Sequence, residues 1–150
     1  MTATDEEIVI PALLRAARGS YGRAVSEGLA AAGFDDLPQN GSFVLGGMAN
    51  FGGSAADMIS GLGVSKQAAS QLIDTLVIRG YLTREINAED RRRMTIELTE
   101  RGRSAAAAIR SAVEAVDAEL AGKISPAQLA GLRAGLTALA EIRQHGHHHQ

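Results

Sequence analysis

Hydrophobic side chains recur at helical spacing near the start of the chain. From Pro11 to about Ala32 they follow one another in steps of three and four residues, which puts them on one face of a helix. The apolar positions are Leu14, Ala17, Tyr21, Val25 and Leu29. Gly33 comes next, and glycine is the usual residue just past a helix end. The pattern predicts a first helix that ends near Ala32.

The stretch from Asp35 to Gly53 is rich in glycine but contains apolar residues at Phe43, Val44, Met48 and Phe51. We expect a second helix with loose ends here. The pairs Gly46-Gly47 and Gly52-Gly53 have neither the GxGxxG spacing nor the preceding strand of a phosphate-binding loop. We interpret both glycine pairs as helix ends.

A short helix, a tight turn and a longer helix are predicted next. Ala55–Leu62 turns Met58, Ile59 and Leu62 inward, Gly63 can adopt the left-handed conformation that ends a helix, and Ser65 can cap the next one. An advance of about 100° per residue divides Lys66–Arg79 into two arcs. The polar arc holds Lys66, Gln67, Ser70, Gln71 and Asp74, and the apolar arc holds Ala68, Ala69, Leu72, Ile73 and Leu76. A polar arc is ordinarily a solvated face, but amides, a hydroxyl and a lysine are also groups that read DNA in the major groove.

Two alternating segments, Tyr81–Ile86 and Met94–Leu98, predict the strands of a hairpin. Their connection, Asn87–Arg93, is long and polar and ends in three arginines, which is typical of a wing rather than of a tight turn. Arg84 in the first strand has two interpretations: a salt bridge to Glu97 or Asp90, or a contact with DNA.

Two further amphipathic helices are predicted beyond Gly102. The first has an apolar stripe at Ile109, Val113, Val116 and Leu120, and the second at Leu129, Leu132, Leu136 and Leu139. Ser125-Pro126 supplies a cap and a first-turn proline between them, which predicts a helical hairpin. Neither helix can bury its stripe alone, so we expect packing on the first helix and on a second subunit, giving a homodimer. Binding to a membrane surface is the alternative, which the scarcity of basic residues disfavours.

Composition narrows the function classes. At 150 residues and 45% hydrophobic content, the chain is expected to be one globular domain with a buried core. It has no apolar run of membrane-spanning length, and its start is acidic rather than basic, so a cytoplasmic location is expected. The absence of cysteine excludes disulfides, thiolate zinc sites and thiol sensors. An aromatic content of 3% disfavours stacking on single-stranded nucleic acid and leaves duplex DNA as a partner.

The net charge of −2 hides a local excess of positive charge. Residues 64–103 carry eight basic and six acidic side chains, whereas residues 1–63 carry three basic and seven acidic ones. The basic density is highest at Arg91-Arg92-Arg93. A charge run is more often a solvated loop than a binding site, but a local basic patch is also the electrostatic footprint of a nucleic-acid binder.

Four short motifs in order and spacing resemble the MarR family of winged helix-turn-helix transcription regulators. They are Gly63-Val64-Ser65, Gly80-Tyr81-Leu82-Thr83-Arg84, Asp90-Arg91-Arg92 and Leu98-Thr99-Glu100-Arg101-Gly102. The resemblance implies a mainly α fold with a small β-hairpin wing, in one domain over 1–150. Within it, about 36–102 would form the DNA-binding part, about 5–33 and 103–144 the dimerisation helices, and 145–150 a flexible tail.

The resemblance also implies roles for particular side chains. The helix that enters the major groove would use Lys66, Gln67, Ser70 and Gln71, and Ser65 would either contact phosphate or only cap the helix. In the wing, Asp90 would orient Arg92 into the minor groove, and Arg91 and Arg93 would contact phosphates. Arg93 stands where many family members have a small or neutral residue, so either Arg92 or Arg93 would reach deepest.

A small apolar or phenolic effector is expected between the first helix, the second helix and the start of the fifth, because members of the family bind such ligands there. The candidate lining residues are Tyr21, Phe43, Met48 and Phe51, each of which has plain core packing as its alternative.

The sequence therefore predicts a homodimeric regulator, with repression as its action, that binds a pseudo-palindromic duplex and is released by an effector. One alternative is a winged-helix module that binds a protein partner through its arginines. Another is an enzyme or carrier that uses the Gly-rich residues 41–53. Catalysis is not expected, because no cysteine, phosphate loop or histidine before position 145 supplies a nucleophile, base or metal ligand set. We expect no cofactor, and we interpret His145–Gln150 as a tag remnant or mobile end rather than a metal sensor.

Overall fold

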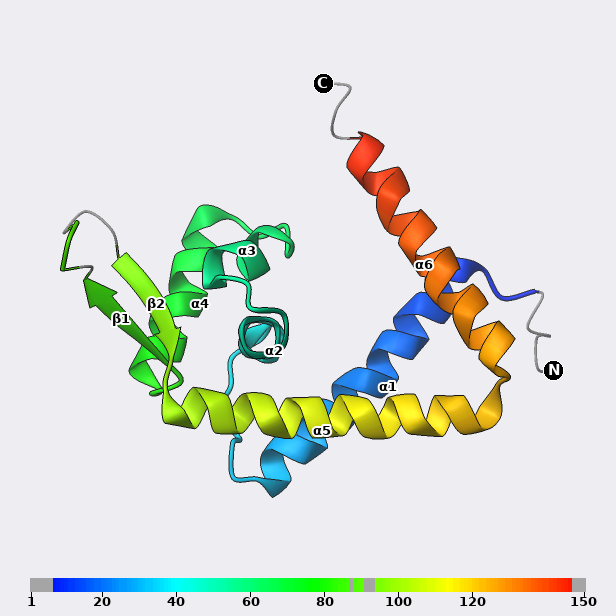
Figure 1. Cartoon of the computed structure of the whole chain (residues 1–150), viewed down its shortest axis with the longest axis horizontal. Helices are drawn as coiled ribbons and strands as arrows, with labels where there is room; N and C mark the ends of the chain where they lie inside the picture. Colours follow the sequence, from blue (N-terminus) through cyan, green and yellow to red (C-terminus); the bar gives the residue numbers. More distant parts are fainter. Residues whose placement is uncertain (1–6, 87, 91–93, 147–150) are drawn as a thin grey trace. The chain divides into compact units, whose positions relative to one another are not determined.

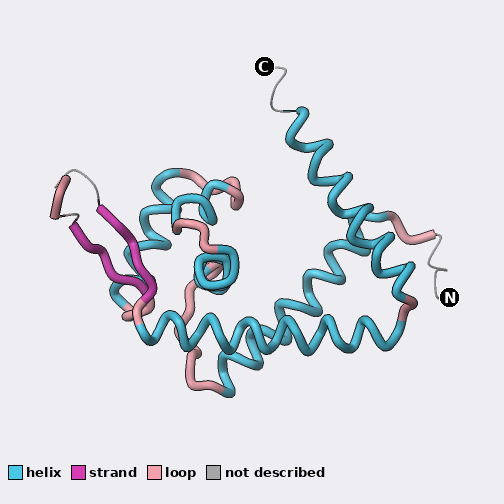
Figure 2. The backbone as a smooth tube through the Cα atoms, in the orientation of Figure 1, coloured by secondary structure: helices cyan, strands magenta, loops and turns pink. Residues whose placement is uncertain are grey.

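The computed structural model describes residues 7–86, 88–90 and 94–146, and these are mainly helical with one antiparallel hairpin (Figures 1 and 2). The elements in chain order are α1 (Ile10–Ala31), α2 (Gly41–Phe51), α3 (Ala55–Ser60), α4 (Lys66–Ile78), β1 (Leu82–Ile86), β2 (Met94–Leu98), α5 (Glu100–Lys123) and α6 (Pro126–Gly146). The predicted fold class, a mainly α winged helix-turn-helix with flanking helices, is confirmed.

The chain divides into two compact units, Met1–Glu114 and Ala115–Gln150. The buried apolar core lies in the first unit and draws on α1, α2, α3, α4, β1 and α5. Its largest fully buried side chains are Tyr81, Leu45, Leu76, Leu82 and Val44. α1 and α5 approach closely within this unit, since a Cβ at Gly28 would lie 3.2 Å from Cβ of Ala112.

The helix-turn-helix forms as its sequence predicts. Ser54 and Asp57 make a reciprocal capping box at the start of α3, with N–O distances of 3.0 and 3.1 Å. Gly63 has φ of 68°, in the left-handed region, and redirects the chain between α3 and α4. Ser65 caps α4 by accepting a hydrogen bond from the amide of Ala68 at 3.1 Å. Local capping therefore fixes where both helices begin.

The interpretation of Gly46-Gly47 as a helix end is wrong, because both glycines are buried inside α2. The physical reason is tight packing against α3: a Cβ on Gly47 would collide with the thioether of Met58. Gly52, by contrast, does end α2, with φ of 66° at the C-cap. A glycine at a helix crossing and a glycine at a helix end have the same appearance in the sequence.

β1 and β2 pair in antiparallel register, from Leu82 opposite Leu98 to Ile86 opposite Met94. The connection between the two strands includes residues outside those described. The base of the hairpin, where Leu82 pairs with Leu98, is bonded to the start of α5. The amide of Thr99 donates to the Tyr81 carbonyl at 3.1 Å, and the amide of Gly102 donates to Oγ1 of Thr99 at 3.0 Å. A Cβ on Gly102 would collide with the Tyr81 carbonyl oxygen, so this close approach requires glycine.

The second unit contains the end of α5 and all of α6. Oγ of Ser125 caps α6 by accepting a hydrogen bond from the amide of Gln128 at 3.1 Å, and the amide of Ser125 donates to Oε1 of Gln128 at 2.9 Å. The break between the two helices therefore falls where Ser125-Pro126 predicts. None of the side chains described in residues 115–142 is buried. Within the described residues, no helix combines the length and apolar character needed to cross a membrane.

Candidate nucleic-acid interface

The polar arc of α4 is fully displayed to solvent. Its five members are all exposed: Lys66, Gln67, Ser70, Gln71 and Asp74. On the opposite side Leu72, Ile73 and Leu76 are buried in the core. Ala68, assigned to the apolar arc, is instead exposed, because it lies in the first turn of α4, ahead of the buried positions. The helix thus presents one amide- and hydroxyl-bearing face on a rigid apolar base.

Ser65 lies at the N-cap of α4, and its Oγ accepts from the Ala68 amide. This bond uses an acceptor lone pair and leaves the hydroxyl proton available to donate. Capping and a phosphate contact, the two roles that the sequence left open, are therefore compatible in one side chain.

The wing residues fall at the limit of what the structure describes. Asp90 is exposed, and Arg91, Arg92 and Arg93 lie outside the described residues. The strands that carry this connection do lie beside α4, as Figure 1 shows for the green part of the chain. The described strands thus belong to the same unit as the polar arc.

Arg84 forms an ion pair with Asp74 of α4, which is not one of the partners that the sequence suggested. The strand register explains why Glu97 is not favoured: Arg84 is opposite Ile96, so Glu97 belongs to the other face of the hairpin. The ion pair joins the polar arc of α4 to β1. Both side chains remain partly exposed, at 37% for Arg84 and 54% for Asp74.

A cavity of about 960 Å³ lies between α1, α2, the loop that joins them and the first half of α5. Its wall is mostly apolar, and charged side chains reach it from Arg18, Asp35, Arg110 and Glu114. The last two form a salt bridge of 2.9 Å one helical turn apart. The volume lies within the usual range of small-molecule sites, about 300–1,000 Å³.

The four candidate effector residues are distributed differently around this cavity. Tyr21 from α1 and Phe43 from α2 line it. Met48 borders a second cavity of about 390 Å³ instead, because the α2 face that lines the first runs through Gly46, Gly47 and Asn50. The side chain of Phe51 lies outside what the structure describes.

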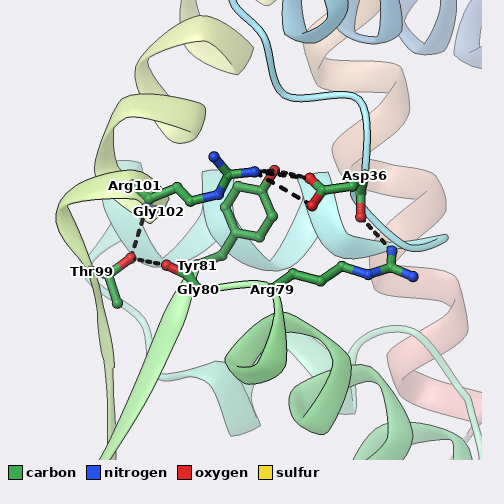
Figure 3. Close-up of polar contacts among 7 residues, drawn as sticks. All are labelled: Asp36, Arg79, Gly80, Tyr81, Thr99, Arg101 and Gly102. Atoms are coloured by element: carbon green, nitrogen blue, oxygen red, sulfur yellow. Dashed lines mark hydrogen bonds and ion pairs between the residues drawn. The ribbon is translucent and has the colours of Figure 1, made fainter.

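A polar cluster that the sequence did not reveal lies at the base of the hairpin (Figure 3). We call it the Asp36 cluster, formed by Asp36, Tyr81 and Arg101. The Asp36 carboxylate accepts hydrogen bonds from the Tyr81 hydroxyl and from Nη2 of Arg101, the latter at 3.2 and 3.4 Å. Arg101 Nη2 also donates to Oη of Tyr81 at 3.0 Å. Its guanidinium lies over the rings of Tyr81, at 4.6 Å, and Phe34, at 5.4 Å.

The electrostatics of the Asp36 cluster favour the charged carboxylate beside a neutral phenol. The hydrogen bond from Tyr81 lowers the pKa of Asp36; partial burial opposes this shift and Arg101 reinforces it. Burial raises the pKa of Tyr81, and its bond to Asp36 raises it further. Near neutral pH, therefore, Asp36 accepts and Tyr81 donates. Tyr81 and Arg101 lie in two of the four motifs quoted above, but no single motif brings the three residues together, because they are separated by 45 and 20 positions in the chain.

Two helices joined by a tight turn, followed by a two-stranded hairpin beside the second helix, define a winged helix-turn-helix protein. Residues 37–93 match the sequence profile of the MarR family. The winged helix-turn-helix region of this chain is therefore similar in sequence to the MarR family.

Solved structures share this fold across nearly the whole chain. The S. aureus MepR–DNA complex is 21% identical, covers 90% of this chain and 98% of its own, and has a TM-score of 0.71. The repressor CouR bound to a 23-mer DNA duplex is 19% identical, with coverage of 93% and 98% and a TM-score of 0.69. RV1404 from Mycobacterium tuberculosis is 22% identical, with coverage of 95% and 97% and a TM-score of 0.66. Among curated proteins, none matches the chain.

Proposed function

We propose that this protein is a DNA-binding transcription regulator that acts as a repressor. The observation that carries the proposal is the exposed polar arc of α4, held on a buried apolar base within a region that matches the MarR family. A helix of this width fits the major groove, and amide side chains can form paired hydrogen bonds with base edges. MepR and CouR, which share the fold, have been solved as complexes with DNA.

In this proposal the arginines at residues 91–93 supply affinity, whereas α4 supplies sequence discrimination. Phosphate contacts position a protein on the duplex, and contacts with base edges specify the site. Arg84 lies in β1, between α4 and the three arginines, and would add a further contact with DNA. Its ion pair with Asp74 orients it.

The proposal includes a homodimer on a pseudo-palindromic site. The apolar stripe of α6 supports it, because Leu132, Leu136 and Leu139 are each more than 40% exposed in one chain. Contiguous exposed apolar side chains at helical spacing are typical of interfaces. Two copies related by a two-fold axis would place two α4 helices on successive turns of the duplex.

The proposal also includes release by a small apolar or phenolic effector in the cavity of about 960 Å³. A mostly apolar lining with a few charged residues is the composition expected of a small-molecule site. The aromatic residues that line the cavity and would contact such a ligand are Tyr21, Phe34 and Phe43.

Selection from random duplexes, followed by gel-shift titration, tests the proposal. We expect enrichment of an inverted repeat and loss of discrimination when Gln67 and Gln71 are replaced by alanine. Thr137→Ala, at an exposed site on α6, is the matched control. A folded protein that enriches no duplex at low salt would contradict DNA binding and favour a winged-helix module for a protein partner.

A further inference from the structure

The loop between α1 and α2 has two roles in the first unit. Phe34, Asp35, Leu37 and Pro38 line the large cavity, so this loop is part of the cavity wall. Asp36, in the middle of the same loop, makes its bonds to Tyr81 and Arg101 instead. The cavity wall and the Asp36 cluster therefore share one loop.

The other side of the Asp36 cluster is the base of the hairpin. Tyr81 is fully buried and immediately precedes β1, and Arg101 lies in the first turn of α5, which closely follows β2. Thr99 joins the two segments: its amide bonds the Tyr81 carbonyl, and its Oγ1 donates to the Gly80 carbonyl and accepts from Gly102. Because Gly102 also contacts the Tyr81 backbone closely, the hairpin base has little room to yield.

A second bond ties the same loop to α4. The guanidinium of Arg79, at the C-cap of α4, donates to the backbone carbonyl of Asp36. The one loop thus holds the end of α4, the start of β1 and the start of α5, as Figure 3 shows. These are the elements that set how the recognition helix and the hairpin lie against each other.

From this arrangement we infer that the Asp36 cluster is a mechanical link between the large cavity and the DNA-binding surface, so that a change at either one is transmitted to the other. The inference rests on the proposed function for its biological meaning, but the link itself is a property of the free protein. Asp36, Tyr81 and Arg101 are positioning residues in it. Coupling between two sites can be carried by packed side chains and hydrogen bonds that connect them.

Amide hydrogen exchange of the free full-length protein tests the link in both directions. Tyr81→Phe removes the hydroxyl but keeps the ring under Arg101, and should accelerate exchange in residues 34–41 by about fivefold or more. Asp36→Asn should do the same in residues 94–102, where the Thr99 amide reports on the hairpin base.

Two controls separate a link from a loss of stability. Asp35→Asn makes the same charge change one residue away, at a side chain that lines the cavity outside the Asp36 cluster. Ile73→Val weakens the core through a buried side chain of α4. Neither control should accelerate the distant segment beyond its effect on global unfolding, measured by urea titration. Effects of Tyr81→Phe and Asp36→Asn that stay within their own segments, or that Ile73→Val reproduces, would overturn the inference.

A second arm uses the duplex selected above. Binding of this duplex to the wild-type protein should slow exchange in residues 34–41, and Asp36→Asn should abolish that protection. If the wild-type protein binds the duplex and exchange in the loop is unchanged, the link is absent. If no duplex binds, the proposed function fails, and the free-protein measurement still decides the link.

Discussion

α4 and α6 are alike in sequence pattern and opposite in environment. Both carry an apolar stripe at steps of three and four residues beside a polar face. On α4 the stripe is covered by the chain's own core, where Leu76 is 0% and Leu72 is 8% exposed. On α6 the corresponding leucines are left open, with Leu136 and Leu139 each 41% exposed.

The difference teaches that periodicity tells which residues share a face but not what covers the face. The apolar stripe of α4 is covered by short-range partners, because a capped tight turn before it and a hairpin after it fold back on the helix. α6 comes last, with no later element among the described residues to cover it. In the proposed homodimer, a second copy of the chain covers this stripe.

Truncation of a core leucine on α4 should produce the largest effect. Leu76→Ala removes a fully buried side chain and leaves a cavity, so the free energy of unfolding should fall by about 2–5 kcal/mol. Urea denaturation at several protein concentrations measures this. The loss for Leu76→Ala should be the same at every concentration, whereas Leu136→Ala should show a loss that grows with dimer occupancy. An equal, concentration-independent loss for both variants would mean that the two stripes are covered in the same way.

Charge on the open stripe of α6 should break the dimer. Leu136→Glu should convert a species of twice 15.6 kDa into one of 15.6 kDa in light scattering after gel filtration, because each leucine that returns to water costs about 1.5–3 kcal/mol. Ala134→Glu adds the same charge about 160° around the helix and is the matched control. A wild-type protein that is already a monomer at micromolar concentration would end the dimer proposal.

Much of the fold could be predicted because its determinants are local. Ser65 and Ser125-Pro126 act within a few residues, and α4 and α6 begin there. Gly63 adopts the predicted left-handed conformation, although α3 ends earlier, at Ser60. The interior position of Gly46-Gly47 could not be predicted in this way. It depends on Met58 in another helix, and no local pattern records packing between two helices.

The candidate site also has a part that local sequence predicts and a part that depends on contacts between distant segments. The exposed arc of α4 follows from helical periodicity alone, and the sequence identified all its members. The partner of Arg84 depends on the register of the hairpin and on its approach to α4, so Asp74 was missed. The Asp36 cluster joins three segments remote in sequence and was missed for the same reason.

Single substitutions in α4 should change sequence preference, whereas single substitutions of the arginines at 91–93 should change overall affinity and its salt dependence. Gln71→Ala should change preference at particular operator positions by about 1–3 kcal/mol for each pair of hydrogen bonds removed, with little change in salt dependence. Arg93→Ala should weaken binding to all duplexes and reduce the slope of log affinity against log salt by roughly one for each phosphate that is no longer neutralised. Lys123→Ala, an exposed charge at the end of α5, controls for net charge. Unchanged affinity and slope for Arg91→Ala, Arg92→Ala and Arg93→Ala would make the hairpin a purely structural element.

The smallest effect should be the pH dependence of the Asp36 cluster, because the side chains of Asp36 and Arg101 are 40% and 41% exposed and solvent screens their attraction. The hydrogen bond from Tyr81, with help from Arg101, lowers the pKa of Asp36 in the folded chain. A carboxyl with a lowered folded-state pKa stabilises the fold at any pH above its unfolded value, about 3.9, and loses that contribution as the pH falls through the folded value.

The difference in urea midpoint between the wild-type protein and Asp36→Asn should therefore be constant from about pH 5 to 7 and shrink below about pH 4. Asp35→Asn, which makes the same charge change at a residue that lines the cavity outside the Asp36 cluster, is the matched control. A gap between wild type and Asp36→Asn that persists undiminished at pH 3 would mean that the asparagine variant loses packing rather than charge, and that the carboxylate itself does not hold the loop to the hairpin base.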